Sequence, residues 1–90
     1  MLIFRFTDEV PGQPVDVAAV MDRAKAAGEL QRATNEVLRV LVVRARLGIR
    51  EVAHAEIAAR AGISTSKVSA AMHELQRRGV LRLEHVVMGR

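Results

Sequence analysis

Residues 54–84 read HAEIAARAGISTSKVSAAMHELQRRGVLRLE and hold the most regular pattern in the chain. Their apolar spacing predicts a short helix over residues 56–61 and a second helix over residues 65–78. Gly62 stands where the chain must leave the first helix in a left-handed conformation, which glycine adopts without steric cost. Ser64 is expected to cap the second helix, because its hydroxyl can accept a hydrogen bond from a free amide of the first turn. The segment therefore predicts two helices joined by a three-residue turn.

Two helices that cross steeply after so short a turn need a small residue at their contact, and Ala58 supplies it. Together with Gly62, Ile63 and Val68, Ala58 stands at the offsets of a helix-turn-helix motif. The 20 residues from 54 to 73 fit this motif without an insertion. Helical domains that bind no nucleic acid also use a short helix, a glycine and a capped helix, so that interpretation remains open.

The charge distribution favours a polyanionic partner. Residues 1–31 hold three bases against five acids, a net charge of −2, whereas residues 32–90 hold eleven bases against five acids, a net charge of +6. A basic surface is expected in the C-terminal part, and nucleic acid is its natural partner. Twelve of the fourteen bases are arginine, which a GC-rich genome also favours, so charge alone does not decide the matter.

The second helix of the motif has two distinct faces. Val68, Met72 and Leu75, with Ala71 beside them, recur at helical spacing and are expected to face the core. The predicted DNA-binding residues are Ser64, Thr65, Ser66, Lys67, Ser69, Ala70, His73, Arg77 and Arg78. Small side chains at the helix start let the backbone approach the floor of the major groove, whereas Arg77 and Arg78 suit phosphates or the last helix carbonyls. No arginine stands at a base-reading position, so discrimination by a single helix is expected to be modest, and a solvated polar face is the simpler alternative.

Two segments alternate with period two and predict strands. In residues 1–7 the alternating residues are Leu2, Phe4 and Phe6 against Ile3, Arg5 and Thr7. After Gly79 they are Leu81, Leu83, His85 and Val87 against Val80, Arg82, Glu84 and Val86.

A helix-turn-helix followed by a glycine and a strand is the order found in winged-helix domains. The junction LQRRGVLR at residues 75–82 resembles that of many bacterial regulators such as the MarR group, and the likeness covers roughly residues 34–88. It implies a mainly α fold with a small β-ribbon, a winged helix-turn-helix. A wing needs a return strand, so either the wing is truncated or the N-terminal strand over residues 2–6 completes it, and we favour the second. The ending EHVVMGR is also similar to RepL-type plasmid replication proteins.

Two further helices are expected before the motif. One begins at Pro14, has Asp16 in its first turn and runs to about Ala27, with Val17, Val20, Met21 and Ala24 as its apolar side. The other runs from Leu30 or Thr34 to Leu47, and Val40 and Val43 extend its apolar surface almost around the helix. Half of all residues are hydrophobic and the mean hydropathy is +0.12, so we expect a homodimer that covers part of this surface.

The composition excludes several function classes. There is no cysteine, and the only aromatic residues are Phe4 and Phe6, which disfavours disulfide scaffolds, thiolate zinc sites and base-stacking binders of single strands. No phosphate loop, nucleophile elbow or catalytic carboxylate pair is present, so we predict no enzymatic activity and no cofactor. Glu51 and His54 have the spacing of metal ligands but lack a second pair. Without a spanning segment or a signal peptide, we expect a soluble protein of the cytoplasm, not bound to membranes.

The sequence therefore predicts one compact domain in two parts. Residues 1–33 are expected to support the fold and dimerisation, and residues 34–90 to form the DNA-binding region. The expected function is that of a dimeric transcriptional regulator that binds double-stranded DNA. A plasmid or phage replication or partition protein and a winged-helix module that contacts only proteins are the alternatives, and a small-molecule effector stays open.

Overall fold

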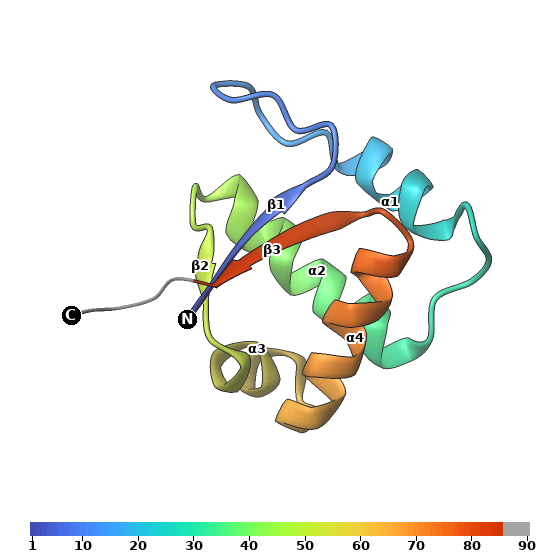
Figure 1. The fold of residues 1–90 in the computed structure, drawn as a ribbon, viewed down its shortest axis with the longest axis vertical. Helices are drawn as coiled ribbons and strands as arrows, with labels where there is room; N and C mark the ends of the chain where they lie inside the picture. The colour runs from blue at the N-terminus through green and yellow to red at the C-terminus, as the bar shows by residue number, and fades with distance from the viewer. Residues whose placement is uncertain (86–90) are drawn as a thin grey trace.

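The computed structural model describes residues 1–85 and is mainly helical, with one small antiparallel sheet (Figure 1). Its elements in chain order are β1 (Leu2–Phe6), α1 (Val17–Lys25), α2 (Arg32–Arg46), β2 (Glu51–Val52), α3 (His54–Ala61), α4 (Thr65–Arg77) and β3 (Leu81–His85). None of these helices combines the length and the apolar character that crossing a bilayer requires.

The sheet has the strand order β2-β1-β3, so the first strand of the chain is its centre. Phe6 of β1 lies opposite Leu81 of β3, and the pairing continues to Leu2 opposite His85. The expected pairing of the N-terminal strand with the strand after Gly79 is thus confirmed. No sequence pattern indicated β2, whose two residues pair with Ile3 and Leu2 on the other side of β1. Val86 and Val87, which belong to the same alternation, lie outside the described residues.

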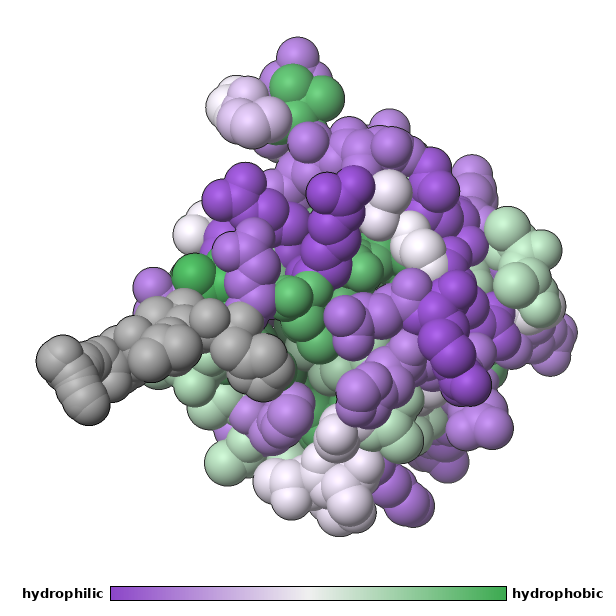
Figure 2. All heavy atoms as spheres, in the orientation of Figure 1, coloured by the Kyte–Doolittle hydropathy of each residue, from purple (hydrophilic) through white to green (hydrophobic). Residues whose placement is uncertain are grey.

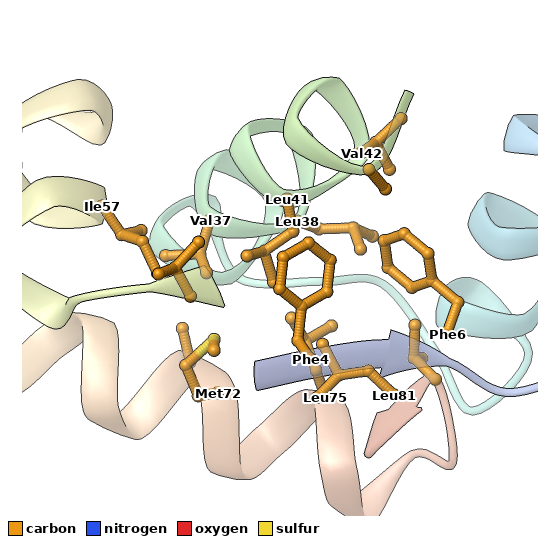
Figure 3. Close-up of a cluster of buried hydrophobic side chains, with 14 of the residues drawn as sticks. Phe4, Phe6, Val37, Leu38, Leu41, Val42, Ile57, Met72, Leu75 and Leu81 are labelled. Carbon is orange, nitrogen blue, oxygen red and sulfur yellow. The ribbon is translucent and has the colours of Figure 1, made fainter. Parts of the chain in front are cut away.

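The core lies between the sheet and the helices (Figure 3). Leu2, Phe4 and Phe6 are buried because period-two alternation turns one side of β1 inward. Phe4 is fully buried and meets Phe6 edge to face, with ring centres 5.6 Å apart. Figure 3 shows both rings beneath α2, which contributes Leu38 and Leu41, while Leu75 of α4 closes the core from the other side.

The helix boundaries differ from the expected ones at two starts. Helix α1 begins at Val17 rather than at Pro14, because Asp16 caps it from outside: its carboxylate accepts a hydrogen bond from the amide of Ala19 at 3.0 Å. Asp16 is therefore a cap, not a first-turn residue. Helix α3 begins at His54, two residues before the predicted Glu56. The ends follow the glycines, since Gly28, Gly48, Gly62 and Gly79 all have positive φ.

Candidate functional site

The turn between α3 and α4 has the geometry that the sequence predicts. Gly62 is left-handed, with φ of 71° and ψ of 34°, and its amide donates to the carbonyl of Ala58 at 2.9 Å. The amide of Ile63 donates to the same carbonyl at 3.1 Å, and the Ile63 side chain packs against the core. Ala58 itself is buried, and α3 packs against both α4 and α2. This turn aims the start of α4 away from α3 and fixes which side of α4 faces solvent.

Helix α4 is sharply divided between a buried and an exposed side. Val68, Ala71, Met72 and Leu75 are each at most 2% exposed, as expected. The residues that share the exposed side are Ser64, Thr65, Ser66, Lys67, Ala70, His73, Gln76 and Arg77, and we call this set the outer face of α4. Ser69 is half-buried at its margin. The outer face contains no large apolar side chain, so nothing in its composition calls for cover by another part of the chain.

Ser64 has a structural task at the start of α4. Its hydroxyl accepts a hydrogen bond from the amide of Lys67 at 3.3 Å, and it lies 3.2 Å from the hydroxyl of Ser66. The remaining amides of the first turn point outward with the positive end of the helix dipole. Ser64 thus orders the helix start beside Thr65 and Lys67, the residues available to a ligand.

Arg77 and Arg78 are neighbours in sequence but occupy different environments. The side chain of Arg77 is 76% exposed and pairs with Glu74 one turn earlier. The side chain of Arg78 is 13% exposed and donates to the carbonyls of Ala24 at 2.8 Å, Gly28 at 2.5 Å and Glu29 at 3.1 Å. Its Nε also donates to Glu74 at 2.8 Å. Because these acceptors engage the guanidinium, we remove Arg78 from the expected phosphate contacts and assign it to the joint between α1 and α4.

Glu74 connects the two arginines. The hydrogen bond from Arg78 is the main reason that the pKa of the Glu74 carboxyl lies below its ordinary value of 4.5; partial burial opposes this shift, and Arg77 adds to it. Glu74 is therefore ionised at neutral pH. Glu74 was not among the predicted site residues, although its spacing of three and four residues from the arginines is the one at which helical side chains meet.

Several other cations are neutralised within the fold. Arg44 lies 2.8 Å from Glu56, and Arg50 lies 2.8 Å from Glu9, with its guanidinium over the ring of Phe4. By contrast, Lys67 makes no ion pair with any described residue. Figure 2 shows hydrophilic residues over much of the region that contains α4, with paler, weakly polar residues where the helix begins. A shallow hollow lined by Ala70, His73, Gln76 and Arg77 lies on the outer face.

The chain was compared with known proteins at three levels. It matches no protein-family model, no curated protein and no solved structure. Function is therefore inferred from the residues and their geometry.

Metal binding has little support in the described part of the chain. No group of three or more histidine, aspartate or glutamate residues there is arranged to hold a metal ion. Glu51 lies in β2 and His54 begins α3 without a third candidate ligand. The outer face of α4 remains the best candidate for a functional site.

Proposed function

We propose that the chain binds double-stranded DNA by placing the outer face of α4 in the major groove. The observation that carries this proposal is the combination of a helix held firmly by its buried side and a fully exposed side made of small, polar and cationic residues. A groove about 12 Å wide admits one α-helix, and small side chains allow the closest approach.

The strand arrangement supports a winged-helix version of this motif. In such domains the strand after the second motif helix pairs with a return strand, and here β1 occupies that position between β2 and β3. The N-terminal segment would thus complete the wing that the likeness to bacterial regulators implies, although the chain order differs from the usual one.

The residues divide into two kinds of contact. Lys67 and Arg77 are cationic and exposed, which suits backbone phosphates. Ser66, Ser69, Ala70 and His73 stand where base edges would lie, and hydroxyls accept several bases. Such a helix discriminates modestly, so we propose a cytoplasmic homodimer that reads two half-sites and regulates transcription.

The two lysines of the chain offer a matched test. Lys67→Ala should weaken binding to every duplex by a similar factor, about tenfold, and lower the salt dependence of binding, whereas Lys25→Ala on α1 should change neither. Fluorescence anisotropy with labelled duplexes at several salt concentrations measures both effects. With about six phosphate contacts per dimer, affinity should fall roughly a thousandfold between about 50 and 200 mM salt. An affinity for duplex DNA that does not change with salt concentration, or an equal loss of affinity in the two lysine variants, would contradict the proposal.

Selection of bound duplexes from a random pool identifies the role. Inverted repeats would support a dimeric regulator. Tandem direct repeats would instead indicate replication or partition, and recovery of no sequence together with no duplex binding would indicate a protein-interaction module.

A further inference from the structure

Among residues 1–85, strand β3 is an edge strand of the sheet. The amide of Thr7 donates to the carbonyl of Val80 at 2.9 Å, which marks these opposite residues as a hydrogen-bonded pair. Because hydrogen-bonded pairs alternate along an antiparallel ladder, Arg82 and Glu84 also direct their backbone groups toward β1. The amide of Phe4 donates to the carbonyl of Arg50 on the opposite side of β1. This agrees with the alternation, because Phe4 stands between residues whose backbone groups face β3.

Leu81 and Leu83 therefore direct their amides and carbonyls away from β1; Leu83 is partly exposed, whereas Leu81 is only 3% exposed and is covered by the rest of the fold. Among the described residues, neither residue has a backbone hydrogen bond on that side. Figure 1 shows β3 crossing in front of α2, on the side of the molecule turned toward the viewer. The partly exposed edge at Leu83 is therefore a template for pairing with another strand.

The side chains on the solvent face of β3 carry complementary charges. Arg82 and Glu84 are both exposed, and they flank Leu83. If β3 pairs with a second β3 in the antiparallel sense about Leu83, each Arg82 lies directly opposite Glu84 of the other copy. The outward direction of the Leu83 backbone groups agrees with this register, because Leu83 then forms a hydrogen-bonded pair with Leu83 of the other copy. One register thus satisfies both the backbone and the charges.

Arg82 also lacks an acidic partner directly across the sheet within its own chain. It lies opposite Arg5 of β1, and both side chains are exposed. Neither arginine makes an ion pair with a described residue. Like charges directly opposite one another destabilise a strand pair. A glutamate from a second copy would compensate for this repulsion.

We propose that two copies of the chain associate through β3, antiparallel about Leu83, into a continuous six-stranded sheet. This rests on the dimer of the proposed function and names its surface as β3 instead of the apolar side of α2 that the sequence led us to expect. The contact does not require DNA, so it is tested without DNA.

A charge exchange on β3 provides the test. Sedimentation equilibrium should show a dimer of the wild-type chain, and Arg82→Glu should raise its dissociation constant about tenfold or more, because two acids then face each other in each pair. The double variant Arg82→Glu, Glu84→Arg restores opposite charges and should recover most of the affinity. Arg39→Glu makes the same charge change at an exposed arginine of α2 and should leave the dimer intact.

A second readout separates loss of pairing from loss of folding. Arg82→Glu places an acid opposite Arg5 within the chain, so at a protein concentration low enough for both chains to be monomeric its resistance to urea should be equal to or higher than that of the wild type. A monomeric wild type at high micromolar concentration would overturn the proposal. So would a dimer that survives Arg82→Glu but dissociates on Leu47→Glu, since the exposed apolar end of α2 would then be the interface. A wild-type chain that forms the dimer but binds no duplex would contradict the proposed function and leave the β3 contact standing.

Discussion

Helices α2 and α4 pack against each other, yet their solvent sides differ in apolar content. The outer face of α4 has no large apolar residue, whereas α2 exposes Val43, and Leu47 just beyond its end is 70% exposed. The buried sides of both helices are apolar, with Leu38 and Leu41 on α2 and Val68 and Leu75 on α4. Burial thus requires apolar residues on the inner sides of both helices, whereas the solvent-facing sides can differ and can contact different partners.

The largest expected effect on stability comes from a substitution on the buried side of α4, compared with one on the exposed side of α2. Leu75→Ala removes a fully buried side chain between α4 and the rest of the core, so the free energy of unfolding should fall by about 2–5 kcal/mol. Val43→Ala shortens a side chain that is 57% exposed and should change stability by less than about 0.5 kcal/mol. Urea unfolding followed by circular dichroism measures both. Equal losses would mean that the solvent side of α2 is covered in solution.

A smaller effect compares the two arginines at the end of α4. Arg78→Ala leaves the carbonyls of Ala24, Gly28 and Glu29 without their charged donor and should cost about 1–3 kcal/mol of stability. Arg77→Ala removes only an exposed partner of Glu74 and should leave stability nearly unchanged while weakening DNA binding. Urea unfolding and duplex titration on the same pair of variants separate the two roles. A stability loss in Arg77→Ala as large as that in Arg78→Ala would contradict this division.

The smallest effect concerns the stability of the protein at acidic pH, to which ionised Glu74 contributes. Its pKa is lowered in the folded chain, so the stability it contributes is fully present above about pH 4.5 and is lost as the pH falls through the folded value. Glu74→Gln cannot ionise and lacks this contribution at every pH. Urea midpoints measured from neutral pH down to about pH 3 should therefore fall less steeply for Glu74→Gln than for the wild type. Parallel curves would show that the hydrogen bond from Arg78 does not favour the ionised form.

Local periodicity predicted most of the fold. The buried side of α4, the cap at Ser64 and the left-handed Gly62 all depend on neighbours within one or two turns, which is why the sequence reveals them. Strand β2 was not predicted, because two residues are too few to show an alternating pattern. Its pairing with β1 also joins residues far apart in the chain, which local periodicity does not reveal. The role of Arg78 was equally hidden, since its acceptors in Ala24 and Gly28 lie 54 and 50 residues away.

The central place of β1 has a consequence for synthesis. Its two neighbours in the sheet follow only at Glu51 and Leu81, so a ribosome delivers β1 long before either of them. During that interval Phe4 and Phe6 belong to a nascent strand with both edges open, the condition under which chaperones bind and chains aggregate. The sheet can be completed only after β3 has emerged from the exit tunnel, because β3 is the last of its three strands to be synthesised.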